Sequence, residues 1–117
     1  MTYLPGTHLV ATIKPAGAAL INDYGAFREK INQLIRQFSL NKLGEVYHNF
    51  QPAGFTAVIC LSESHISIHT WPEHSLANLD IYLSNYQRSN DNTVVSIFEE
   101  ILQLFDASVL HQQCICR

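Results

Sequence analysis

The sequence has little charge, few cysteines and no long apolar run. Charged residues make up 15% of the 117 residues, and the net charge is −3 at pH 7. Without a basic run, a general nucleic-acid binder is excluded. No apolar stretch reaches the roughly 20 residues that span a bilayer, and the first residues lack the regions of a signal peptide. We therefore expect no membrane contact. The three cysteines, Cys60, Cys114 and Cys116, lack the spacing of a disulfide framework, so we expect reduced thiols and a cytoplasmic protein.

The apolar periodicity predicts one domain over residues 1–117. Two stretches, around 27–38 and 93–105, have the 3.6-residue period of helices with one apolar face. Strands are expected at 8–14, 43–50, 55–61, 66–70, 76–83 and 107–115, and 84–92 reads as a polar loop. Neighbouring strands most simply pair antiparallel. The predicted fold class is therefore α+β: a two-layer α/β sandwich with a mainly antiparallel sheet and two helices on one face.

Hydroxyls, imidazoles and carboxylates are densest at residues 62–73, which read SESHISIHTWPE. Within this stretch His65, Ser67 and His69 alternate with apolar neighbours. That is the period of a strand with one apolar face and one reactive face.

The sequence gives only weak signals for a metal site and for a hydrolytic triad. His65 and His69 lie ~13 Å apart along an extended strand, too far to share an ion without a bend. Cys114 and Cys116 could chelate, but no third ligand is adjacent, so we expect no metal. A triad of Ser64, His69 and Asp80 lacks the Gly-x-Ser-x-Gly turn of a hydrolase nucleophile.

A third possibility is the Glu63–Ser64 peptide bond itself. A serine hydroxyl can attack the preceding carbonyl when the backbone is strained and a base is near. Elimination from the resulting ester, followed by hydrolysis, leaves a pyruvoyl group. Such a group forms a Schiff base with an amine and withdraws electrons as a cofactor does.

Residues 62–73 resemble the signature of the prokaryotic S-adenosylmethionine decarboxylases, which make their own pyruvoyl cofactor. The resemblance spans about positions 6 to 84. It includes Gly6-Thr7-His8-Leu9-Val10-Ala11, His48-Asn49-Phe50, Pro52-Ala53-Gly54 and Asn78-Leu79-Asp80-Ile81.

The resemblance implies a role for each matching residue. Self-cleavage between Glu63 and Ser64 would give chains 1–63 and 64–117, with Ser64 becoming the pyruvoyl group. His69 would assist in processing, and Thr56 stands where the family usually has a helping serine. Phe50 would stack on the adenine of the substrate, and Glu73 would accept hydrogen bonds from its ribose.

Ser84 stands where the family usually has a catalytic cysteine that protonates the substrate carbon. The resemblance implies a homodimeric decarboxylase of S-adenosylmethionine that supplies spermidine synthesis. Two alternatives stay open. One is a pyruvoyl-dependent decarboxylase of another amino acid, such as ornithine or arginine. The other is an unprocessed, non-catalytic binding or regulatory subunit.

Overall fold

The computed structural model describes residues 3–86 and 88–117, so position 87 of the expected polar loop lies outside the described residues. Helices and strands follow one another in the predicted order. They are β1 (Thr7–Lys14), the 3-10 helix η1 (Ala18–Ile21), α1 (Gly25–Gln37), β2 (Lys42–Asn49), β3 (Phe55–Leu61), β4 (Ser64–Trp71), the 3-10 helix η2 (Pro72–His74), β5 (Leu76–Leu83), α2 (Asp91–Leu104) and β6 (Ser108–Cys116).

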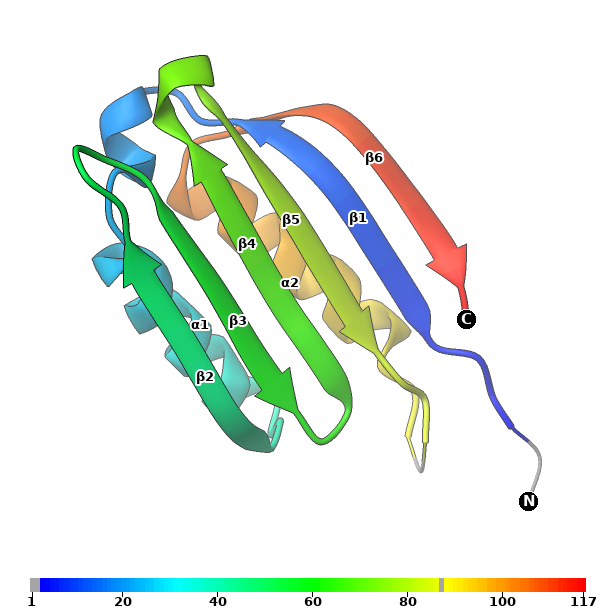
Figure 1. The fold of residues 1–117 in the computed structure, drawn as a ribbon. Helices are drawn as coiled ribbons and strands as arrows, with labels where there is room; N and C mark the ends of the chain where they lie inside the picture. The colour runs from blue at the N-terminus through cyan, green and yellow to red at the C-terminus, as the bar shows by residue number, and fades with distance from the viewer. Residues whose placement is uncertain (1–2, 87) are drawn as a thin grey trace.

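Within the described residues the strands form one antiparallel sheet in the order β2-β3-β4-β5-β1-β6. Both helices cover the same face of this sheet (Figure 1). Strands β2 to β5 pair with their neighbours in sequence, as expected. Strand β1 instead lies between β5 and β6, because α1 separates it from β2 in the chain and leads to the opposite edge (Figure 1). The predicted two-layer α+β sandwich is confirmed.

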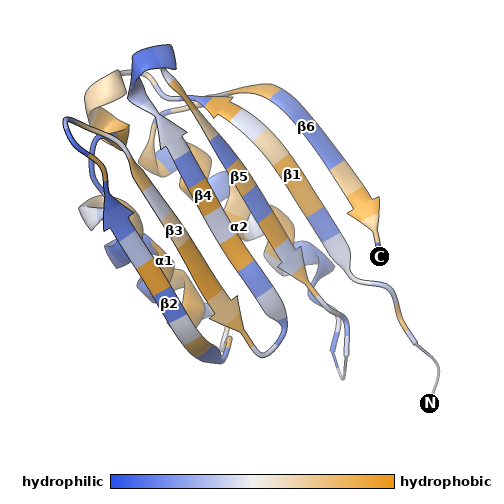
Figure 2. Ribbon diagram, viewed as in Figure 1, coloured by the Kyte–Doolittle hydropathy of each residue, from blue (hydrophilic) through white to orange (hydrophobic). Residues whose placement is uncertain are grey.

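The core lies between the helices and one face of the sheet. Figure 2 shows hydrophobic and hydrophilic residues alternating along the strands, and the buried apolar side chains of the strands face the helices. Phe27 of α1 stacks on Phe105 at 6.5 Å between ring centroids and lies 5.8 Å from Phe55. All three rings are buried, and burying a side chain of this kind contributes about 1.5–3 kcal/mol. These contacts fix the helices on the sheet.

The carboxylates near the N-termini of α1 and α2 make different hydrogen bonds. Asp23 accepts a hydrogen bond from the N–H of Gly25 at 2.9 Å, as expected near the start of α1. In α2, Asp91 is the first helical residue, and its carboxylate accepts from the Thr7 hydroxyl at 2.6 Å and from the Asn85 amide at 3.0 Å. The N-cap residue of α2, Asn90, makes no side-chain cap hydrogen bond, and the Asp91 carboxylate ties the helix start to β1.

No helix among the described residues is long and apolar enough to cross a membrane. No described residue forms a layer over the sheet face turned away from α1 and α2 (Figure 1). We call it the open face, and its side chains are the odd-numbered ones of β4 with their cross-strand partners.

Candidate active site

The open face carries three rows of directly opposite residues that run across the sheet. One row is Gly44, Cys60, His65, Tyr82, His8 and Ile115; the next is Val46, Val58, Ser67, Asp80, Val10 and Gln113; the third is His48, Thr56, His69, Asn78, Thr12 and His111. Imidazoles thus gather in the first and third rows, on both sides of a middle row in which three of the six residues are valines.

Ser64 begins β4 after a two-residue turn, with Leu61 and Leu83 as its cross-strand partners. Its φ is 136°, a value that a residue with a Cβ atom rarely adopts and that costs roughly 1–3 kcal/mol. Such a conformation persists only where the surrounding structure holds it. The strained torsion therefore lies at the N–Cα bond of Ser64, directly after the Glu63–Ser64 peptide bond.

The carbonyl before Ser64 is held by a backbone donor. The N–H of Ser84 donates to the carbonyl oxygen of Glu63 at 2.7 Å. Ser84 is itself fixed, because the buried Asn90 donates from its amide to the Ser84 carbonyl at 2.8 Å. Gly6 packs so closely that a Cβ at this position would lie 2.9 Å from the Cα of Ser84. Glu63, Ser64 and Ser84 are thus brought together at one end of β4.

Thr56 and His69 form a second group on the third row. They are direct cross-strand partners of β3 and β4. The Thr56 hydroxyl makes a short contact with Nδ1 of His69, and it also donates to the carbonyl of Ile68 at 3.4 Å. The threonine hydroxyl therefore holds the His69 imidazole through Nδ1.

His69 also lines a cavity of about 430 Å³ with two other predicted site residues, Phe50 and Glu73. Trp71 adds a further aromatic ring to the wall. The full lining is Phe50, Gln51, Pro52, Ala53, Phe55, His69, Thr70, Trp71 and Glu73. The aromatic rings of Phe50, Phe55 and Trp71 and one carboxylate suit a flat heterocycle that carries hydroxyls or a positive charge.

The two groups do not meet within one chain. Ser64 and His69 are five residues apart on the same regular strand, and a strand rises ~3.3 Å per residue. Their Cα atoms are therefore ~16 Å apart. The chain presents half of the predicted site at each end of β4.

A larger cavity, of about 650 Å³, lies at the Ser64 end. It is lined by Ser39, Asn41, Ser62, Glu63, Ser84, Tyr86 and Arg88. Burial works to raise the pKa of the Glu63 carboxyl, but hydrogen bonds from Arg88, from Ser62 and from the Asn41 backbone outweigh it, so that the pKa is lowered. Arg88 and Asn90 had no signal in the sequence, because both lie in a polar loop without periodicity.

Comparison with known proteins identifies the family. The family model described as S-adenosylmethionine decarboxylase matches residues 7–114. The chain belongs to the S-adenosylmethionine decarboxylase family.

Several curated relatives carry the name S-adenosylmethionine decarboxylase proenzyme. The one from Aquifex aeolicus is 43% identical over 77 residues, which cover 66% of this chain and 57% of that protein. The one from Picrophilus torridus is 34% identical over 103 residues, or 88% of this chain and 78% of that protein. The crystal structure of the adenosylmethionine decarboxylase from Aquifex aeolicus superimposes with a TM-score of 0.79 and 28% identity, over 99% of this chain and 91% of that chain. The chain thus spans little more than half of the first relative by sequence, and nearly all of this structure by fold.

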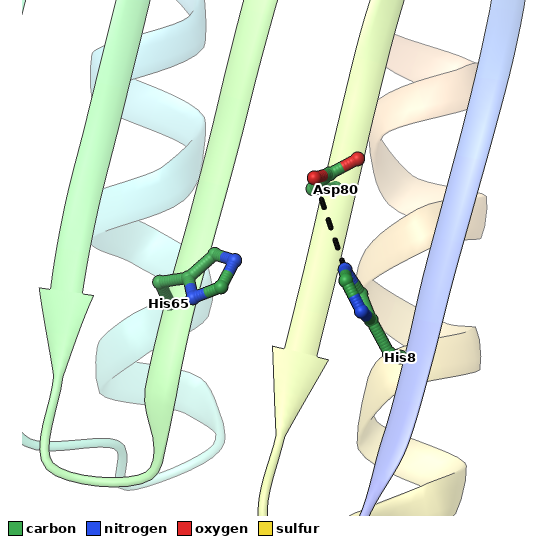
Figure 3. A group of neighbouring side chains, drawn as sticks. All are labelled: His8, His65 and Asp80. Carbon is green, nitrogen blue, oxygen red and sulfur yellow. Dashed lines mark ion pairs between the residues drawn. The ribbon is translucent and has the colours of Figure 1, made fainter. Parts of the chain in front are cut away.

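His8, His65 and Asp80 form a cluster on the open face of this decarboxylase-family chain (Figure 3). One potential ligand atom from each residue lies within 4.8 Å of the others. However, Arg117 approaches Nδ1 of His8 at 3.2 Å, and a guanidinium can only donate. The proton of the neutral ring therefore lies on Nε2, which faces an oxygen of Asp80 at 3.8 Å. A metal ion would have to reverse this tautomer and displace Arg117.

His8 should titrate below the ordinary histidine pKa of 6.5. Burial lowers the pKa of His8, the positive charge of Arg117 lowers it further, and the Asp80 carboxylate raises it only in part. In a histidine NMR titration, we expect Arg117→Gln to raise the pKa of His8 and Asp80→Asn to lower it.

Asp106→Asn provides the matched control, because this carboxylate lies in the turn before β6, at the far end of the sheet from His8. We expect it to leave the pKa of His8 unchanged. A pKa of His8 that falls or stays constant in Arg117→Gln would contradict the tautomer described above.

Proposed function

We propose that this protein is a self-processing, pyruvoyl-dependent decarboxylase of S-adenosylmethionine that supplies aminopropyl groups for spermidine synthesis. The observation that carries the proposal is the strained Ser64 whose preceding carbonyl accepts the N–H of Ser84. Membership of the family and the names of its relatives support the same activity.

The residues at this end of β4 suit an acyl shift. When the hydroxyl oxygen of Ser64 adds to the Glu63 carbonyl carbon, negative charge develops on the oxygen that already accepts the Ser84 N–H. A donor that is in place before the reaction stabilises such an oxyanion without reorganisation. The C–N bond then breaks, the nitrogen takes the proton, and an ester joins Glu63 to Ser64.

Elimination completes the processing. A base removes the α-proton of Ser64, and Glu63 leaves as a carboxylate, which frees chain 1–63. Water then replaces the nitrogen of the remaining dehydroalanine and releases ammonia, which leaves a pyruvoyl group at residue 64. When present, this group condenses with the amine of an amino acid and withdraws electrons from the carbon that bears the carboxylate.

The second cavity suits the nucleoside of the substrate. Phe50 is half exposed at its rim and can stack on adenine, and Trp71 offers a second aromatic face to the sulfonium charge. The Glu73 carboxylate can only accept when ionised, which fits two ribose hydroxyls. Ornithine and arginine carry no aromatic base to fill this space.

The ~16 Å between Ser64 and His69 requires a second copy of the chain, so we propose a homodimer. A two-fold axis that crosses β4 near its middle places the Ser64 end of one open face against the His69 end of the other. Sheets packed face to face lie about 10 Å apart, within the reach of side chains from both. His69, Thr56, Phe50 and Glu73 of one copy then complete the site at Ser64 of its partner.

We propose the cytoplasm as the site of action. Cys60, Cys114 and Cys116 are free and exposed. Exposed free thiols persist in a reducing compartment.

Freshly purified protein should contain two polypeptides in place of one 13.2 kDa species. Intact mass under denaturing conditions is expected to show chains 1–63 and 64–117, the second beginning with a pyruvoyl group. Ser64→Ala removes the attacking hydroxyl and should leave the full-length mass. A single full-length species in the wild type would overturn the proposal and favour a non-catalytic binding or regulatory subunit.

Processing should occur between copies. His69→Asn alone is expected to remain uncleaved, because neither copy supplies the imidazole. Co-expressed with Ser64→Ala, which keeps His69 but has no serine to cleave, the His69→Asn chain should be cut, as intact mass would show. The control partner is the double variant Ser64→Ala/His69→Asn, which should give no rescue. If His69→Asn is cut equally with both partners, the two-copy site is wrong.

Ser84 favours a second candidate, a decarboxylase of another amino acid, because the family's usual thiol is missing. An unperturbed thiol has a pKa of about 8.5 and is a far better proton donor than a hydroxyl. If the substrate is S-adenosylmethionine, Ser84→Cys should raise carbon dioxide release from labelled substrate by about tenfold or more. The neighbouring, exposed Ser89→Cys is the matched thiol control and should not. Turnover of labelled ornithine or arginine, with none of S-adenosylmethionine, would establish the second candidate.

A further inference from the structure

The turn that carries the scissile bond is tied down at its side chain as well as at its carbonyl. Arg88, from the loop between β5 and α2, donates from Nη2 to Oε2 of Glu63 at 2.6 Å. The Ser62 hydroxyl donates to the other carboxylate oxygen at 2.9 Å. The Glu63 side chain is 14% exposed, so this ion pair is shielded from water on the Glu63 side. Both oxygens of the carboxylate thus have a donor.

The same guanidinium connects a third segment. Nη2 of Arg88 also donates to the carbonyl of Ser39 at 3.1 Å, in the turn after α1. Close by, the N–H of Ser62 donates to the carbonyl of Asn41 at 2.9 Å. The hairpin turn is therefore fixed against the α1–β2 connection on one side and the β5–α2 loop on the other.

Glu63 is held at both functional ends. Its carbonyl lies on the Ser84 N–H, and its carboxylate lies on Arg88. Ser84 and Arg88 both lie between β5 and α2. This segment therefore makes two hydrogen bonds to Glu63, one to its carbonyl and one to its carboxylate. Two fixed points leave the plane of the scissile peptide little freedom to turn away from the Ser64 hydroxyl.

We propose that Arg88 is a positioning residue for self-cleavage, which holds Glu63 so that its carbonyl faces both the Ser64 hydroxyl and the Ser84 N–H. This inference rests on the self-cleavage proposed above. Arg88 does not touch the reacting atoms, and it acts through the carboxylate of Glu63. Fixing two reacting groups in the attack geometry raises an intramolecular rate because orientation is already established.

The test is the rate of self-cleavage after cell-free synthesis, followed by intact mass. Arg88→Gln should slow the conversion of the full-length chain by about tenfold or more, since small losses of alignment are costly to intramolecular reactions. Arg88→Lys should recover part of the rate, because an ammonium keeps the charge but loses the planar fork.

The Glu63 side should report the same interaction. Glu63→Gln removes the charge that Arg88 pairs with, and it should slow cleavage about as much as Arg88→Gln. The double variant Arg88→Gln/Glu63→Gln should be little slower than either single variant, because both remove one shared interaction. Arg36→Gln is the matched control, since this arginine is exposed in the last turn of α1, and it should cleave at the wild-type rate.

The outcomes separate this inference from the function on which it rests. If the wild type cleaves and Arg88→Gln cleaves as fast, the positioning role is wrong and self-cleavage stands. If the effects of Arg88→Gln and Glu63→Gln add up in the double variant, Arg88 does not act through Glu63. The same conclusion follows if Arg88→Lys recovers none of the cleavage rate. If the wild type itself stays intact, both self-cleavage and this role are overturned. Thermal melting of each variant identifies any loss of rate that follows from unfolding.

Discussion

The fixed rise of a β-strand is the constraint on which the arrangement of this protein depends. Strand β4 pairs along its full length with β5 and nearly so with β3, so it cannot bend to bring its ends together. Ser64 at one end and His69 near the other are therefore held apart by ~16 Å. The same pairing makes each end rigid, with a strained serine at one and an oriented imidazole at the other. Under the proposed function, a fold of this kind supplies two half-sites, which a second copy would join.

The open face explains how a second copy can do so. Its middle row is apolar at β2, β3 and β1, and Val46 and Val58 are 65% and 42% exposed. The imidazoles lie to either side of this row, toward the two ends of the strands. Packing two such faces about a two-fold axis would bury the valines and bring the polar ends of the strands together.

Much of the fold could be predicted from the sequence because its signals are local. The apolar period of 27–38 and the alternation of 65–70 each reflect one element and one face. Contacts between residues far apart in the sequence were harder to predict. The place of β1 between β5 and β6 depends on the path of α1, and it is this pairing that brings His8 to Asp80. Arg88 meets Glu63 only through the folding of an aperiodic loop. The resemblance to a family named the site residues, but the strand geometry was needed to see that they form two groups.

Ser84 acquires a different meaning once its backbone is considered apart from its side chain. The N–H that holds the Glu63 carbonyl is present whatever residue stands at this position, so cleavage does not depend on a thiol. Reprotonation of the substrate carbon, in contrast, needs an acidic side chain at the right place. Exchange of cysteine for serine at this point therefore separates two functions that one residue serves. Under the proposed function, it would leave formation of the pyruvoyl group intact, and proton transfer would fall to a hydroxyl or to a group from which that hydroxyl can relay a proton. Tyr86 lines the same cavity and carries a phenol hydroxyl. A serine here is thus compatible with self-cleavage, and its consequences fall on the turnover of the substrate.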